Sequence, residues 1–162
     1  MENNILFRTI KTFTAVFFVV AFFTYPTTSF SAPENLIIPL WENGAPGFEN
    51  RKHEPEVVNK GSITNVHNPS LTVFAPSKEA SNGIGIIIAP GGGLRKLGMR
   101  GGGEEPAQFL ADNGFTAFVL KYRLSRQPGQ PYKFEEHVLQ DGQRAVRLVR
   151  HRAQEFHINP DK

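Results

Sequence analysis

The chain has 162 residues, enough for one domain with a sizeable core, and its 18 basic and 15 acidic residues give a net charge of +3. That balance is ordinary for a globular protein. Because the chain contains no cysteine, a disulfide framework and cysteine-based metal or redox chemistry are excluded.

Residues 1–31 are predicted to be a secretory signal peptide. A positively charged start precedes a short apolar run at residues 13–23, and Ser29 and Ser31 fit the −3 and −1 positions of a cleavage site. A membrane anchor is the alternative, but spanning a bilayer takes about 20 apolar residues. The sequence therefore predicts cleavage after Ser31 and a secreted or periplasmic protein, which meets the membrane only through this segment during export.

Residues 32–61 are predicted to be a polar lead-in that is rich in proline and carries no assigned strand or helix. Leu40 and Trp41 form a bulky apolar pair within it, and we expect this pair to pin the segment to the body of the protein. His53 stands beside Glu54, and such an isolated pair is expected to be solvated at the surface.

Three strands are predicted next, and the third leads into a glycine loop. Residues 62–66 and 70–75 are expected to form the antiparallel start of a sheet. The β-branched run at 84–89 is typical of a strand buried on both faces, and Pro90 ends it. Gly91–Gly93 follow directly. Because glycine leaves backbone N–H groups open to a ligand, this loop is a candidate for binding an oxyanion.

A second glycine triplet at 101–103 and the cations between the two triplets suggest a phosphate site, but the spacing does not fit one. A P-loop requires Gly-Lys-Ser/Thr, whereas Gly98 is followed by Met99 and Arg100. A dinucleotide fingerprint requires G-x-G-x-x-G, which the first triplet does not complete. Nucleotide binding is therefore not predicted.

A helix at 104–113, a strand at 115–122 and a long helix at 134–156 complete the chain. Strand, helix and strand in this order predict a βαβ crossover with parallel pairing, and hence an α/β fold. The arginines of the last helix are interpreted as a solvated face rather than a nucleic-acid site. Asp141 is a poor helix former in mid-helix, so we expect hydrogen bonding or packing to retain it.

Several segments, taken in order, resemble one family. They are Pro39–Trp41 with Gly44–Gly47, Asn68–Val73, Ala89–Gly93, Thr116–Leu124 and Gln140–Arg147. Together they resemble the N-terminal half of an exported α/β-hydrolase-fold esterase of the acetyl-xylan esterase and carboxylesterase group. The resemblance implies a partial α/β-hydrolase domain over residues 62–162, with about four strands and two helices, which ends before the nucleophile-elbow strand.

The resemblance also implies which residues of the glycine loop matter. In such enzymes this loop supplies the oxyanion-hole N–H groups, at the place where lipases carry an HGGG motif. Gly92 and Gly93 would be these donors, next to Gly91, with Pro90 standing where the histidine would be. Leu94 replaces the aromatic residue often found after the triplet.

The nucleophile, acid and base of a catalytic triad are not in this chain. No serine after residue 31 lies in a G-x-S-x-G elbow. His137, His151 and His157 precede any elbow, whereas the family's histidine comes last, so we interpret them as surface or packing residues. Tyr122 and Arg123 resemble a structural motif beside the glycine loop. No metal or cofactor is implied.

Two classes of hypothesis remain open from the sequence. In the first, the chain is the N-terminal portion of an exported serine hydrolase that cleaves acetyl esters of polysaccharide or small esters, or a serine peptidase of the same fold. In the second, it is a non-catalytic remnant or a carbohydrate-binding protein. An ester substrate, including acetylated polysaccharide, is the expected partner, and nucleic acid is not.

Overall fold

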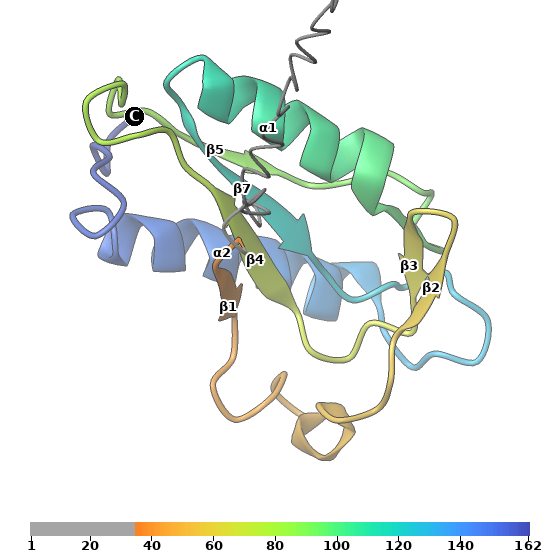
Figure 1. Ribbon diagram of the computed structural model, residues 1–162. Coiled ribbons are helices and arrows are strands. Elements are labelled where there is room, and N and C mark those ends of the chain that lie inside the picture. Colours follow the sequence, from red (N-terminus) through yellow and green to blue (C-terminus); the bar gives the residue numbers. More distant parts are fainter. Residues whose placement is uncertain (1–34) are drawn as a thin grey trace, which may run out of the picture. The chain divides into compact units, whose positions relative to one another are not determined.

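The computed structural model describes residues 35–162, so the predicted signal peptide lies outside the described residues. The described part of the chain combines a four-stranded sheet, a three-stranded sheet and two α-helices (Figure 1). None of its helices is long and apolar enough to cross a membrane. This α/β composition confirms the predicted fold class.

The main sheet has two inner strands, and one of them, β7 (Thr116–Lys121), is buried along most of its length. Its strands, in spatial order, are β1 (Ile37–Pro39), β4 (Ser70–Phe74), β7 and β5 (Gly85–Ile88). β7 pairs antiparallel with β4 and parallel with β5, and β4 pairs antiparallel with β1. The run predicted to be buried on both faces is β5, but its side chains are only half-buried, because β5 pairs only with β7 among the described strands.

The predicted βαβ crossover is confirmed. From β5 the chain passes through η2 (Arg100–Glu104) and α1 (Glu105–Asp112) to β7, and the two strands pair in parallel. The second glycine triplet, which precedes the predicted helix, forms the helical turn η2. Gly103 allows this turn to pack closely, because a Cβ there would lie 2.7 Å from Val119 Cγ1 and 2.9 Å from Pro90 Cγ.

The last helical segment lies across the opposite face of the main sheet. It consists of η3 (Phe134–Val138) and α2 (Leu139–His151), and its predicted continuation to Phe156 is a series of turns. Phe118 of β7 meets Phe156 edge-on, with ring centroids 5.0 Å apart, while the next residue, Val119, faces η2. Successive strand residues point to opposite faces, so helices cover both sides of the sheet (Figure 1).

The predicted strand at 62–66 does not begin the main sheet. It is β3 (Ser62–Thr64), which lies in a small antiparallel sheet between β2 (Val57–Asn59) and β6 (Leu97–Gly98). Lys60 and Gly61 join β2 to β3 with φ of +46° and +77°. Positive φ at both positions is what a type I′ hairpin turn requires. Lys-Gly is a weaker signal for this turn than Asn-Gly, and no hairpin was predicted there.

Candidate functional site

Four chain segments meet at the edge of the main sheet where its parallel strands end. β5 runs into Pro90–Leu94, called here the glycine loop, and β7 runs into residues 122–133, called the β7–η3 loop. Because β4 is antiparallel to β7, its first residue, Ser70, pairs with Lys121 at the same edge. The end of β1 lies there as well, where Leu40 N–H donates to the Pro69 carbonyl at 2.9 Å. Ligands of open α/β sheets bind at this edge.

The glycine loop is a tight turn closed by backbone hydrogen bonds. The Gly98 N–H donates to the Gly91 carbonyl at 2.8 Å, and the Arg95 N–H donates to the Gly92 carbonyl at 3.2 Å. Gly92 has φ of +150° and Gly93 has φ of +65°. A Cβ on Gly92 would lie 1.9 Å from the Lys96 carbonyl oxygen, so this position accepts only glycine.

Backbone donors in this loop remain free for a ligand. Within residues 35–162, the N–H groups of Gly92 and Gly93 have no hydrogen-bond partner. Gly93 is exposed and Gly92 is half-buried, so both positions are accessible. An unpaired N–H attracts an anionic or carbonyl oxygen. The loop therefore offers two adjacent main-chain donors on a turn whose conformation is set by its own backbone.

Tyr122 fixes the base of the glycine loop. Its side chain is buried, and its hydroxyl donates to the Pro90 carbonyl at 2.7 Å. Burial raises the pKa of Tyr122, so the hydroxyl keeps its proton and remains a donor. Tyr122 thus stabilises the first residue of the glycine loop, in agreement with the structural role that the resemblance implied.

Replacing Tyr122 by phenylalanine is expected to lower the free energy of unfolding by about 1–2 kcal/mol, because the buried Pro90 carbonyl loses its donor. Urea unfolding at pH 7 measures this change. Ser125→Ala in the neighbouring loop is the control, since within the described residues the Ser125 hydroxyl has no hydrogen-bond partner. Equal midpoints for the two variants would contradict the supporting role of Tyr122.

Arg123 and Asp141 form a fully buried ion pair behind the β7–η3 loop. Arg123 Nη2 lies 2.7 Å from Asp141 Oδ1, Arg123 Nε lies 2.9 Å from Oδ2, and both side chains have 0% exposure. Trp41 Nε1–H also donates to Asp141 Oδ1 at 3.0 Å. These bonds confirm that hydrogen bonding retains Asp141 in mid-helix and that Trp41 pins the lead-in segment to the body.

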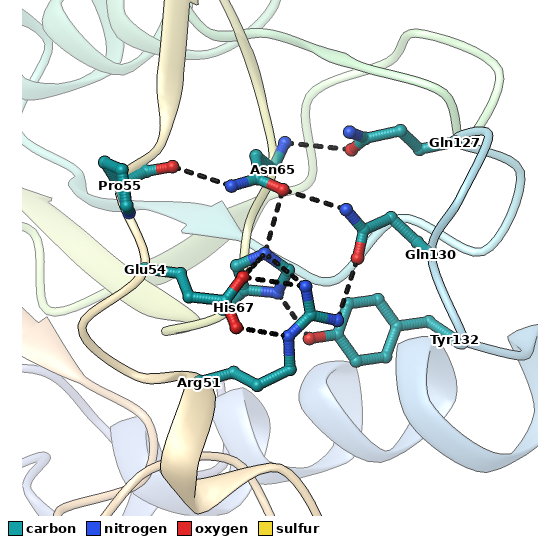
Figure 2. Close-up of polar contacts among 8 residues, drawn as sticks. All are labelled: Arg51, Glu54, Pro55, Asn65, His67, Gln127, Gln130 and Tyr132. Carbon is teal, nitrogen blue, oxygen red and sulfur yellow. Dashed lines mark hydrogen bonds and ion pairs between the residues drawn. The ribbon is translucent and has the colours of Figure 1, made fainter.

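A second polar cluster, which was not predicted from the sequence, lies at this edge (Figure 2). It is centred on His67, which has 0% exposure. His67 Nδ1 lies 2.6 Å from the Tyr132 hydroxyl, and Nε2 lies 2.9 Å from Asn65 Oδ1. The cluster, called here the His67 cluster, comprises Arg51, Glu54, Asn65, His67, Gln127, Gln130 and Tyr132. No local motif marks His67, because most of its partners are distant in the sequence.

His53 and Glu54 are both exposed, as expected for a surface pair, but Glu54 also belongs to the His67 cluster. Its carboxylate accepts from Arg51 Nε at 2.6 Å and from Arg51 Nη2 at 2.8 Å, and Oε2 lies 3.2 Å from His67 Nε2. The hydrogen bond from Arg51 lowers the pKa of Glu54, so the carboxylate stays charged at neutral pH.

The remaining histidines lie away from the glycine loop N–H groups. His151 and His157 are exposed, and His137 is half-buried against Phe48 and Tyr132, with ring centroids 5.2 and 5.7 Å away. An apolar hollow of about 210 Å³ lies next to the glycine loop. It is lined by Ala89, Leu94, Leu120, Tyr122, Phe134, Val138 and Gly142. Leu94 therefore forms part of its wall.

Comparison with solved structures places this architecture among esterases. An acetyl ester-xyloside bifunctional hydrolase from Caldicellulosiruptor lactoaceticus matches with a TM-score of 0.57 and 31% identity, over 82% of this chain and 42% of that one. A thermophilic esterase from the planctomycete Thermogutta terrifontis matches with a TM-score of 0.54 and 21% identity, over 80% and 38%. The propionate-bound form of that esterase matches with a TM-score of 0.54 and 21% identity, over 80% of this chain and 39% of that one.

No family model matches the sequence, and no curated protein does. The chain spans about two-fifths of the length of the solved structures described above. The described residues therefore have a fold like that of part of these α/β-hydrolase esterases.

Proposed function

We propose that this chain provides the oxyanion-binding part of an exported serine hydrolase that cleaves carboxylic esters. The observation that carries the proposal is the pair of unpaired N–H groups on Gly92 and Gly93, held in a turn that only glycine fits. The loop follows a strand of an α/β sheet, where esterases of this fold place an oxyanion donor. The signal-like sequence of residues 1–31 supports export.

In the proposed reaction, a serine hydroxyl supplied outside the described residues attacks the ester carbonyl carbon while a histidine takes its proton. The carbonyl oxygen becomes an oxyanion, which accepts hydrogen bonds from the Gly92 and Gly93 N–H groups. Collapse of this intermediate breaks the C–O bond, and the leaving alcohol takes the proton. Water then hydrolyses the acyl-enzyme by the same steps. One such donor contributes about 100- to 1000-fold to kcat.

Small acyl groups fit the proposal best. The hollow of about 210 Å³ beside the glycine loop is mostly apolar and suits a short acyl chain. The structurally similar hydrolase from C. lactoaceticus is described as acting on acetyl esters and xylosides. The T. terrifontis esterase has been solved with propionate bound. We therefore propose acetyl esters, including those of polysaccharides, as the substrate class.

The test combines sequence and chemistry. We expect the coding DNA to continue past the codon for Lys162 into a G-x-S-x-G elbow, with an acid and a histidine further on. We expect the encoded protein to hydrolyse p-nitrophenyl acetate and to lose this activity when a fluorophosphonate labels the elbow serine. A stop codon at that position, or a labelled protein that remains fully active, would overturn the proposal. Hydrolysis of a peptide substrate in place of the ester would assign it to the peptidases of this fold.

A further inference from the structure

His67 lies in a polar segment before β4, and yet both of its ring nitrogens are satisfied inside the protein. A neutral ring with its hydrogen on Nε2 donates to Asn65 Oδ1 and accepts from the Tyr132 hydroxyl at Nδ1, over 2.9 and 2.6 Å. We assign this tautomer because it satisfies the two shortest contacts of the ring. Arg51 Nη2 lies 3.2 Å from Nε2 and donates instead to Glu54 Oε2 at 2.8 Å. His67 is therefore a structural connector between the segment before β4 and the β7–η3 loop.

The His67 cluster forms hydrogen bonds with the β7–η3 loop at three positions (Figure 2). At the first, the Tyr132 hydroxyl bonds to His67 directly. Gln130 accepts from Arg51 Nη1 at 3.1 Å and donates to Asn65 Oδ1 at 2.8 Å. Gln127 Oε1 accepts from the Asn65 N–H at 2.8 Å. The loop is thus held along its length by side chains from two other segments.

The same loop touches the glycine loop at its other side. The Arg126 N–H donates to the Leu94 carbonyl at 2.9 Å, and Arg126 is the neighbour of Gln127. Leu94 follows Gly93 directly and has φ of +61°, a conformation that is unfavourable for leucine. The hydrogen bond from Arg126 helps to hold Leu94 in this conformation. A shift of the β7–η3 loop would therefore be expected to move Leu94 and, with it, the neighbouring Gly93 N–H.

We propose that His67 is a positioning residue, which holds the β7–η3 loop where it braces Leu94 and thereby fixes the oxyanion donors of the glycine loop. The inference rests on the proposed function only for what the glycine loop binds. The contacts that would carry the coupling run from His67 through Asn65, Gln127 and Arg126 to Leu94, and all of them lie within the described residues.

The charges around His67 make this brace sensitive to acid. Burial lowers the pKa of His67 and the Arg51 guanidinium lowers it further, while Glu54 and Glu56 act in the opposite direction. Protonation would remove Nδ1 as an acceptor, so the Tyr132 hydroxyl could no longer donate to it, and it would place a cation beside Arg51. The other charged or titratable groups around Tyr132 are Arg123, Asp141 and His137. Because the folded pKa lies below the ordinary value of about 6.5, the brace is complete above that pH and weakens as the pH falls below it.

Amide hydrogen exchange of the full-length protein tests the coupling. In His67→Ala we expect the Arg126 amide to exchange at least about tenfold faster than in the wild type under native conditions, after correction for global stability. Val66→Ala is the matched control, since Val66 is the adjacent residue, is 1% exposed and packs in the apolar core without joining the cluster. Equal effects of the two variants on Arg126, or none from His67→Ala, would overturn the proposal.

The pH dependence of exchange at Arg126 distinguishes a positioning role of His67 from a general contribution to stability. In the wild type, exchange at Arg126, corrected for its intrinsic pH dependence, is expected to rise as the pH is lowered from about 7 to 5. In His67→Gln this rise should be absent, and a rise that persists would contradict the role of His67. If neither His67 variant folds, the same exchange measurement is made on Gln130→Ala. Gln130 is half-buried and links the β7–η3 loop to Arg51 and Asn65 of the cluster.

These measurements do not depend on catalysis. If the exchange results follow the expectation but the protein hydrolyses no ester, the proposed function fails and the coupling stands. If ester hydrolysis is found and the Arg126 amide is insensitive to His67, the coupling fails and the proposed function stands.

Discussion

Replacing Asp141 by asparagine is expected to lower the free energy of unfolding by about 3–5 kcal/mol, because it leaves the guanidinium of Arg123 buried without a counter-charge. Both side chains have 0% exposure, so water cannot compensate. Arg123 Nη1 already has no hydrogen-bond partner within the described residues, and its guanidinium lies 5.5 Å from the centre of the Tyr132 ring. The His137 carbonyl and Gln140 Oε1 also accept from Arg123 Nη2, at 3.2 and 2.9 Å, but neither carries the negative charge that the carboxylate supplies.

Urea unfolding followed by tryptophan fluorescence measures this loss directly. Trp41 is the only tryptophan of the chain and donates to Asp141, so its emission reports on the site itself. Glu155→Gln, which changes a carboxylate in an exposed ion pair with Arg152, is the control, and its midpoint should stay close to that of the wild type. A midpoint for Asp141→Asn as high as that of the control would contradict the expectation.

The double variant Arg123→Met with Asp141→Leu separates the cost of an unpaired buried charge from the net contribution of the ion pair. Removing both charges replaces the ion pair by apolar side chains of similar size, which in buried pairs is often neutral or stabilising. We therefore expect the double variant to be more stable than Asp141→Asn alone. The Trp41 N–H still loses its acceptor in the double variant, so full recovery is not expected.

Much of the main sheet was predictable because its signals are local. The apolar runs of β5 and β7 and the helix predicted at 104–113 can each be recognised within about ten residues. The mid-helix position of Asp141 was also recognisable as a conflict with helix propensity. Its partners were not, because Arg123 lies 18 positions away and Trp41 lies 100 positions away. Tertiary contacts of this length leave no pattern in one sequence.

The parts that were missed depend on close approaches between distant segments. The helical turn at Gly103 packs so closely on Val119 and Pro90 that a side chain there would collide with them, and the low helix propensity of glycine gave no sign of a helical turn. His67 is surrounded in sequence by Asn65 and Asn68, which are typical of an exposed turn. Its burial follows from Tyr132, 65 positions later, and from Arg51, 16 positions earlier. The residues that meet at this edge of the sheet could therefore not be predicted from the sequence.

Gly92→Ala is expected to have the largest effect on ester hydrolysis of any change in the glycine loop. Its Cβ would lie 1.9 Å from the Lys96 carbonyl oxygen, and no side-chain rotation can relieve a clash of the first carbon. The backbone must therefore move, and the N–H groups of Gly92 and Gly93 move with it. We expect kcat of the full-length enzyme on p-nitrophenyl acetate to fall by about 100-fold or more, which is the contribution of one oxyanion donor.

Gly91→Ala is the matched control, because it adds the same methyl group one residue earlier, where no atom lies within 4 Å. Its kcat should remain within about twofold of the wild type, since an added methyl in open space leaves the donors in place. If the glycine loop were only a tight turn, Gly92→Ala would lower stability, but correctly folded enzyme would keep its kcat. Thermal unfolding of both variants, together with active-site titration by a fluorophosphonate, gives the rate per folded molecule. A normal kcat for folded Gly92→Ala would remove Gly92 and Gly93 from the catalytic machinery, whereas a loss confined to kcat, with KM little changed, would show that their N–H groups act on the transition state.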